Sequence, residues 1–171
     1  GARDGGRSDA ALLVLKAGLV YSKQKDADAA FALLDRAQSL APDSLDVVAT
    51  RASVLQGCGR ADEARTLLDA LVDRRGDGQA YQLRARYFSA TEQFDLAERD
   101  LVHASKMDQA SPESFSALAR FHEDRGKRRE AIATLDAGLR QHATNPELQR
   151  GLMNVLLSSQ DSTERERGRG L

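Results

Sequence analysis

The sequence holds little cysteine, little proline and few aromatic residues. Cys58 is the only cysteine among 171 residues, so the chain forms no intrachain disulfide and offers no thiolate cluster to a metal ion. No run approaches the roughly 20 apolar residues that span a bilayer, and we expect no membrane insertion. The formal net charge of -1 lacks the basic excess with which proteins neutralise phosphates, so we do not expect nucleic acid as a partner.

The residues that dominate are alanine, leucine and the charged types, which make up 30% of the chain. Apolar positions recur every three or four residues, a spacing that places them on one face of a helix. Strand signals are scarce, since aromatic residues contribute 5%. The sequence therefore predicts an all-α fold.

A pattern of small and large residues repeats along the chain. Ala131, Leu135 and Gly138 give the order small, large, small at helical spacing. A pattern of this kind starts at four alanines spaced 34, 33 and 34 residues apart: Ala30, Ala64, Ala97 and Ala131. Twelve residues before each alanine comes another small residue: Gly18, Ala52, Ala85 and Ala119. We interpret these small residues as contacts that let helix backbones approach closely.

This arrangement resembles the tetratricopeptide repeat, a helix-turn-helix unit of about 34 residues. Gly59 and Gly126 fall in the turns expected between the two helices of a repeat, where a positive φ ends the first helix. The resemblance implies a right-handed α-solenoid of about four to five repeats. Their expected bounds are 11–44, 45–77, 78–111 and 112–145, with the first helix of a fifth at 146–158.

The two ends lie outside the repeats, which occupy 9–158. Residues 1–8 are predicted to be a disordered stretch or a remnant of cloning, and the chain opens on Gly1 without an initiator methionine. Residues 159–171 are predicted to be a truncated second helix of the fifth repeat or a frayed tail. We interpret the chain as a piece of a larger protein.

No motif points to catalysis. The segment around His122, FHEDR, lacks the second histidine that a helical HExxH zinc site requires one turn later. The segment around Cys58, GCG, lacks the third glycine and the preceding strand of a dinucleotide-binding loop. We therefore predict that the chain is not an enzyme and has no catalytic residues, no cofactor and no bound metal.

The resemblance places the candidate site on the first helix of each repeat. In proteins of this family, ligand contacts come mainly from the second, fifth, ninth and twelfth positions of that helix, which line the concave face. The candidate groove residues are Leu12, Leu15, Leu19, Ser53, Gln56, Gln82, Arg86, Ser89, Ser116, Arg120, Glu123, Arg150 and Asn154, with Glu147 at the second position of the last helix. The Lys and Asn clamp of the chaperone-binding members is missing, because Leu15 and Leu19 stand at its positions.

Arg86 and Arg120 hold the same position in successive repeats. Adjacent helices would bring both guanidinium groups within reach of one acidic or carboxylate-bearing ligand. The alternative is that they pair with Glu123 or Gln82 and only keep the groove solvated.

Leu12, Leu15 and Leu19 form a stripe on the N-terminal helix, whose Val14 and Ala17 are needed for packing inside the repeat. A helix that is apolar nearly all round is expected to be covered. Three covers are open: a preceding repeat, a second copy of the chain, or an amphipathic partner helix.

The function that we predict is a non-catalytic scaffold for protein-protein interaction, binding a peptide, helix or partner domain in the concave groove. The Ala, Arg and Leu bias suggests a bacterial protein, within a secretion, envelope or exopolysaccharide assembly and in the cytoplasm or periplasm. The alternative is an RNA-binding helical-repeat protein, whose units have a similar length.

Overall fold

A computed structural model of the chain describes residues 2–107 and 109–170, with side chains described from residue 6 onward. These residues form ten α-helices and no strand, which confirms the all-α class. The helices are α1 (Ala2–Gln24), α2 (Ala27–Leu40), α3 (Leu45–Gly57), α4 (Ala61–Arg75), α5 (Gly78–Ala90), α6 (Phe94–Lys106), α7 (Pro112–Asp124), α8 (Arg128–Gln141), α9 (Pro146–Leu157) and α10 (Ser162–Arg169).

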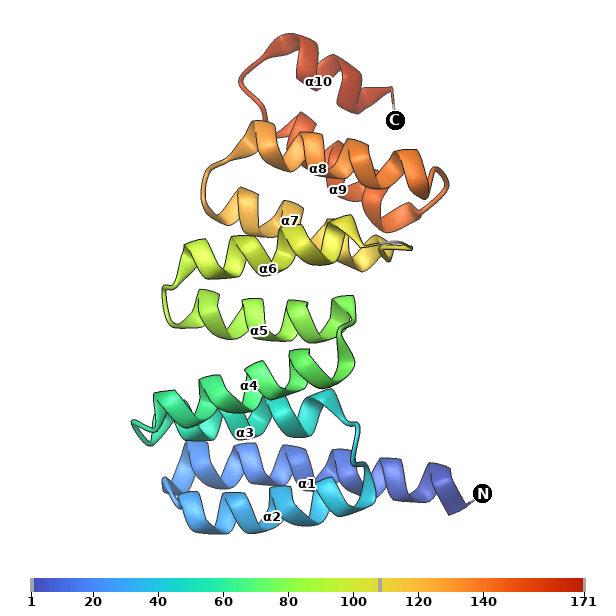
Figure 1. Cartoon of the computed structure of the whole chain (residues 1–171). Helices are drawn as coiled ribbons and strands as arrows, with labels where there is room; N and C mark the ends of the chain where they lie inside the picture. The colour runs from blue at the N-terminus through green and yellow to red at the C-terminus, as the bar shows by residue number, and fades with distance from the viewer. Residues whose placement is uncertain (1, 108, 171) are drawn as a thin grey trace. The chain divides into compact units, whose positions relative to one another are not determined.

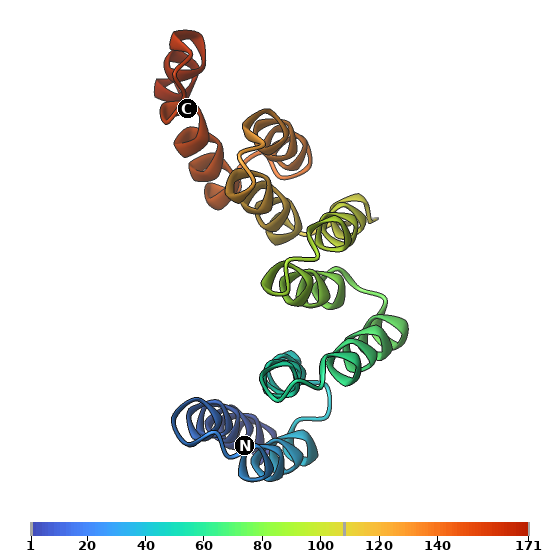
Figure 2. The same cartoon turned by 90° about the vertical axis from the view of Figure 1, so that its left-hand side faces the viewer.

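The chain divides into two compact units, Gly1–Gly76 and Asp77–Leu171. The first unit holds α1 to α4 and the second holds α5 to α10 (Figure 1). In the second unit, α7 packs against both α5 and α9, and α6 and α8 each pack against their neighbours in sequence. Seen along the helices in Figure 2, α5, α7 and α9 lie in one row and α6 and α8 in another. This alternation is the helical-hairpin stacking of a solenoid.

Side-chain caps fix where several helices begin. The first turn of a helix leaves backbone amides without partners, and a short polar side chain before it can accept from one of them. Asp26 accepts from the Ala29 amide at 2.9 Å, and Asp77 accepts from the Ala80 amide at 2.9 Å. Asn145 likewise accepts from the Leu148 amide at 3.0 Å. These caps set the start of α2, α5 and α9.

The repeating small and large positions are buried in both units. The residues predicted from the period at the second helix of each repeat are Ala30, Leu34 and Ala37; Ala64, Leu68 and Leu71; Ala97, Leu101 and Ala104; and Ala131, Leu135 and Gly138, and all twelve are buried. The period therefore reports the packing positions correctly.

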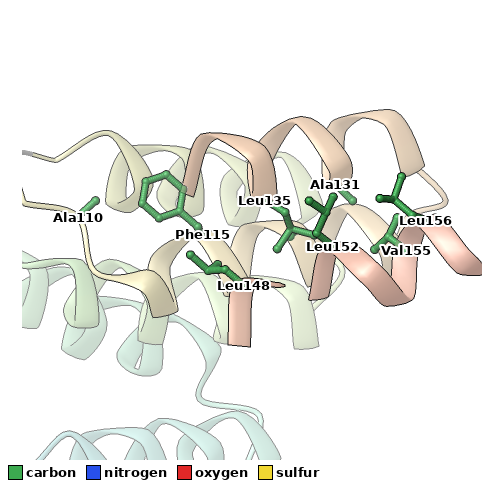
Figure 3. Close-up of a cluster of buried hydrophobic side chains, with 9 residues drawn as sticks. Ala110, Phe115, Ala131, Leu135, Leu148, Leu152, Val155 and Leu156 are labelled. Carbon is green, nitrogen blue, oxygen red and sulfur yellow. The ribbon is translucent and has the colours of Figure 1, made fainter. Parts of the chain in front are cut away.

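Gly138 shows why one of these positions must be small. A Cβ added to Gly138 would lie 2.9 Å from both Cβ and Cγ of Phe115 and 3.0 Å from Cδ1 of Leu148. Figure 3 shows Phe115 and Leu148 in one cluster with Leu135, which joins α7, α8 and α9. The helices approach so closely here that no side chain fits without a shift.

The turn inside each of the first four repeats uses one left-handed residue. Gly59 and Gly126 have φ values of 75° and 68°, as the sequence predicts. The equivalent residues of the other two repeats, Lys25 and Glu92, also adopt positive φ, at 56° and 59°. The turn therefore keeps its geometry even where the residue has a Cβ that disfavours it.

In the structure α1 begins at Ala2, within the stretch 1–8 for which the sequence predicts disorder or a cloning remnant. Extending an existing helix adds one hydrogen bond per residue without a new nucleation step, so α1 continues through Gly5 and Gly6. At the other end, residues 162–169 form α10, which packs against α9.

Candidate partner-binding site

The second unit contains a cavity of about 300 Å³ between α7 and α9, with Leu135 of α8 at its wall. Five candidate groove residues lie together around it. The full lining is Ser116, Ala119, Arg120, Glu123, Leu135, Glu147, Arg150, Gly151 and Asn154. The spacing of the repeat brings these residues together, because α7 and α9 are the first helices of successive repeats and pack side by side.

Two guanidinium groups enter this cavity from different helices. Arg120 comes from α7 and Arg150 from α9, and within the described part of the chain neither forms an ion pair or a hydrogen bond. Arg128, at the adjoining cavity, differs, since it donates to the Val155 carbonyl at 2.8 Å and to the Ser158 carbonyl at 3.1 Å. The charges of Arg120 and Arg150 are therefore available to a ligand, whereas the Arg128 guanidinium group is already hydrogen-bonded to two backbone carbonyls.

Two further polar groups in the lining are Glu123 and Ser116. Burial raises the pKa of Glu123 above its ordinary value of 4.5, the nearby Asp124 carboxylate adds to the increase, and Arg120 and Arg128 act in the opposite direction. Among the buried side-chain oxygens and nitrogens of the described residues, only the Ser116 hydroxyl oxygen has no hydrogen-bond partner. A buried hydroxyl without a partner is costly, so this wall of the cavity favours a ligand or a water.

The remaining candidates of the second unit lie on α5 and are not among the cavity's lining residues. Gln82 donates to the Ser114 hydroxyl at 2.9 Å, a contact that joins α5 to α7. Arg86 is exposed and Ser89 is half-buried. Neither Arg86 nor Arg120 forms an ion pair with Glu123 or a hydrogen bond to Gln82, although the charge of Arg120 acts to lower the pKa of Glu123.

The candidates of the first unit form a different kind of surface. Leu12, Leu15 and Leu19 are 66%, 72% and 58% exposed along α1. Ser53 donates to the Ala49 carbonyl at 3.0 Å, a bond within α3, and Gln56 is exposed. This unit therefore offers leucines where the second unit offers arginines.

A cavity of about 470 Å³ in the first unit also contains arginines, but these are already paired. Arg51 lies 2.7 Å from Asp35 and Arg60 lies 2.6 Å from Glu63. Both guanidinium groups also lie against the Phe31 ring, at 5.9 and 5.3 Å from its centroid. These contacts join the first repeat to the second, which is a structural role.

Gly151 is a lining residue that the sequence analysis does not identify. A Cβ at Gly151 would lie 3.1 Å from Cδ2 of Leu135, so the glycine lets α9 approach α8 and shapes the cavity floor. The period gives no signal for it, since Gly151 lies two positions before Met153, the residue that follows Ala119 by 34.

A family model described as tetratricopeptide repeat matches residues 21–87. Residues 21–87 are therefore similar to tetratricopeptide repeats. The chain is 28% identical over 131 residues to tetratricopeptide repeat protein 13 of Homo sapiens, an alignment that covers 72% of this chain and 15% of that protein. The chain thus spans about a sixth of the length of this curated relative.

Solved structures show the same fold at low sequence identity. Pseudomonas aeruginosa pilF is similar with a TM-score of 0.57 and 18% identity, over 99% of this chain and 76% of the other. The MamA protein gives a TM-score of 0.55 and 13% identity, over 95% and 88% of the two chains. A tetratricopeptide repeat protein from Parabacteroides merdae gives 0.52 and 17%, over 94% and 62%.

The family supports a general role as a scaffold for protein-protein interaction, and its members are generally non-catalytic. Within residues 2–107 and 109–170, no helix is both long enough and apolar enough to cross a bilayer. In the same residues, no group of three or more His, Cys, Asp or Glu side chains is arranged to hold a metal ion.

Proposed function

We propose that this protein is a non-catalytic scaffold that binds a partner segment bearing a carboxylate in the cavity between α7 and α9. The observation that carries the proposal is that Arg120 and Arg150 line one cavity and that neither forms a hydrogen bond or ion pair with another described residue. A guanidinium group matches a carboxylate with two parallel donors, and the contact is stronger where water is partly excluded.

The rest of the lining suits a peptide backbone. The Asn154 amide can donate and accept, and the Ser116 hydroxyl can do the same, so together they match the peptide groups on either side of an acidic residue. The Leu135 side chain and Ala119 add apolar contact.

Two carboxylates in the same lining limit which ligands fit. Glu123 and Glu147 balance the charges of the two arginines, so the cavity has no net positive charge. A strongly anionic ligand would meet both carboxylates, whereas a segment with a single carboxylate can lie against an arginine and avoid them. We therefore expect a preference for isolated acidic residues over acidic runs.

A peptide array tests this proposal directly. Random background sequences are made in matched versions that differ only by aspartate or asparagine at one position, and binding of the labelled chain is compared between the versions. We expect the aspartate versions to bind about two- to fivefold more tightly, since Arg120 and Arg150 are exposed and an exposed ion pair contributes about 0.2–1 kcal/mol. Equal binding of the two versions throughout the array would remove the carboxylate from the proposal.

Paired variants identify the cavity as the binding site. Arg120→Gln combined with Arg150→Gln should abolish the aspartate preference, because no guanidinium group then remains in the lining of the cavity. Arg140→Gln is the matched control, since Arg140 is an exposed arginine on α8 outside that lining. Arg86→Gln tests whether the α5 arginine contributes as the sequence predicts. A preference that survives the double variant would place the site elsewhere.

RNA binding is the second function considered from the sequence, and the cavity argues against it through Glu123 and Glu147. Filter binding at low salt separates the two, because RNA binding falls steeply as salt rises. Tight RNA binding with a steep salt dependence would favour RNA over a protein partner. A bacterial secretion, envelope or exopolysaccharide assembly remains a prediction of the sequence alone.

A further inference from the structure

The stripe on α1 is a second surface that the cavity does not explain. Leu12, Leu15 and Leu19 are 66%, 72% and 58% exposed, and the exposed Ser8 and Ser22 follow at the same spacing at either end. The steps of four, three, four and three residues describe a heptad seam, the pattern that packs one helix against another. An apolar seam of this kind on an exposed helix calls for a partner.

Stacking of repeats uses another face of the helix. In α3, the residues that join the core of the preceding repeat are Val47 and Val54, which are 0% and 2% exposed. Their equivalents 34 residues earlier, in α1, are Leu13 and Val20, which are half-buried. A preceding repeat of the same geometry would therefore cover Leu13 and Val20.

The equivalents of the stripe in the second repeat stay uncovered by the first. Asp46 and Ser53 of α3 are exposed and Ala49 is half-buried, although the first repeat packs directly against this helix. One more repeat on the N-terminal side would leave Leu12, Leu15 and Leu19 exposed in the same way. A partner that covers the stripe must therefore bind the face of α1 that does not stack against a neighbouring repeat.

Charged residues along one border of the stripe indicate which partner fits. Asp9, Lys16 and Lys23 are exposed, lie seven residues apart and therefore follow one side of the seam. None of the three is in a hydrogen bond or ion pair within the described part of the chain. The other border carries the uncharged Ala11 and Gly18 at the same spacing.

We propose that α1 pairs with α1 of a second copy of this chain, antiparallel and related by a twofold axis. A twofold axis across the helices brings the same border of both copies together, so negative and positive members of one border can meet. With Leu12 packed against Leu15 of the second copy, Asp9 lies beside Lys16 of the second copy, and symmetry makes each contact twice. A parallel pair would instead place the charged border against Ala11 and Gly18.

The contact is small. The residues from Ser8 to Leu19 cover about 18 Å of helix at 1.5 Å per residue, which is short for a stable interface. We therefore expect a dimer with a dissociation constant in the micromolar range. The inference concerns the first unit and does not depend on the cavity proposed above.

Analytical ultracentrifugation of the whole chain over a micromolar concentration series tests the dimer. We expect reversible dimerisation, and Leu15→Glu should weaken it at least tenfold without lowering the melting temperature, because Leu15 is 72% exposed. Leu40→Glu, on α2 of the same unit and 46% exposed, is the control and should leave the dimer unchanged. A chain that stays monomeric throughout the series, or a dimer that Leu15→Glu does not affect, would overturn the proposal.

Charge exchange tests the antiparallel arrangement. Asp9→Lys and Lys16→Asp should each weaken the dimer about five- to tenfold, and the double variant should restore it, because both symmetric pairs are re-formed with opposite sign. Lys23→Asp should have little effect in this register. Failure of the double variant to restore dimerisation would reject this pairing of α1 with itself.

Discussion

The two units bury different chemistry in the same kind of helical stack. Two ion pairs show the difference, and in both the partners are 16 residues apart. In the first unit, Arg51 pairs with an Asp35 whose side chain is 69% exposed. In the second unit, Arg84 pairs with Asp100, whose side chain is 5% exposed, through two hydrogen bonds of 2.8 Å. The two arginine side chains are similarly covered, at 22% and 18% exposed, so the pairs differ in the burial of the carboxylate.

The same contrast extends to other residues. The four buried polar or charged residues among those described all lie in the second unit: Asp100, Ser114, His122 and Ser159. The core around α1 and α2 is instead built from alanine, valine and leucine, while three leucines of α1 face outward. Buried polar groups must be paired in one geometry, so the second unit is the part in which single polar substitutions should matter most.

Substitution of the two aspartates gives the largest expected difference. Asp100→Asn leaves the Arg84 guanidinium, 18% exposed, without its carboxylate, and should lower the free energy of unfolding by about 2–4 kcal/mol. Asp35→Asn should cost less than about 1 kcal/mol, because water replaces the exposed carboxylate. Urea unfolding of both variants measures the two costs. Equal costs would show that burial does not distinguish these pairs.

Overpacking at Gly138 should have the next largest effect. Gly138→Leu inserts a side chain where a Cβ alone already lies 2.9 Å from Phe115, and we expect a loss of about 1–3 kcal/mol. Ala133→Leu, on the exposed face of the same helix, is the matched control and should change stability little. Ala137→Leu is a poorer control than the sequence suggests, because Ala137 packs against the same cluster.

Gly57 in the first unit sharpens this test. An added Cβ would contact the Tyr21 ring, but Tyr21 is half-buried and its ring can move away. Gly57→Ala should therefore cost less than Gly138→Ala, although both glycines have close neighbours. Melting temperatures of the two alanine variants report the difference, and a larger loss at Gly57 would contradict this account.

The left-handed turn residues give a smaller effect of opposite sign. Glu92→Gly relieves a positive φ that costs a side-chain-bearing residue about 1 kcal/mol, and should stabilise the second unit by about 0.5–1 kcal/mol. Lys25→Gly should gain less, because it also removes the contact of Lys25 with the Tyr21 ring at 5.3 Å. Gly59→Ala and Gly126→Ala should lower stability by a similar amount. Thermal unfolding of the four variants tests whether the left-handed backbone conformation determines the sign of the stability change.

The sequence predicts the scaffold well, because the steric demand at a helix crossing recurs in every repeat. Ala30, Ala64, Ala97 and Ala131 are each 0% exposed, as the period requires. The candidate site is predicted less completely from the sequence than the fold is. The position rule assigns Arg120 and Arg150 to the groove, but which arginine shares a cavity with Arg120 depends on side-chain directions that a linear pattern does not contain.

Buried polar contacts are also difficult to predict from sequence. Asp100 resembles any surface carboxylate of a helix until Arg84 is placed beside it, and the pair has no equivalent at the same position in other repeats. Repeat-based reasoning finds what the units share and misses what distinguishes one from another. The function of a repeat protein depends on those differences.

Two carboxylates of the second unit should show the smallest effects, with opposite signs. Hydrogen bonds from Lys127 and from His122 hold the pKa of Glu98 below its ordinary value of 4.5, whereas burial raises the pKa of Glu123 above it. A lowered folded pKa stabilises the protein above the unfolded pKa, and this stability is lost as pH falls through the folded value. A raised folded pKa stabilises the protein at pH values below the unfolded pKa, and this stability is lost as pH rises through the folded pKa.

Glu98→Gln should therefore destabilise the second unit at neutral pH, and Glu123→Gln should stabilise it. Both changes should stay below about 1 kcal/mol, because water screens these partly exposed groups. Both differences from the unsubstituted chain should shrink as pH falls below about 4, where the carboxylates become protonated in the folded and unfolded states alike. Urea unfolding at neutral and acidic pH measures each variant. If both variants changed the free energy of unfolding with the same sign at neutral pH, the burial of Glu123 and the pairing of Glu98 would not determine how these carboxylates affect stability.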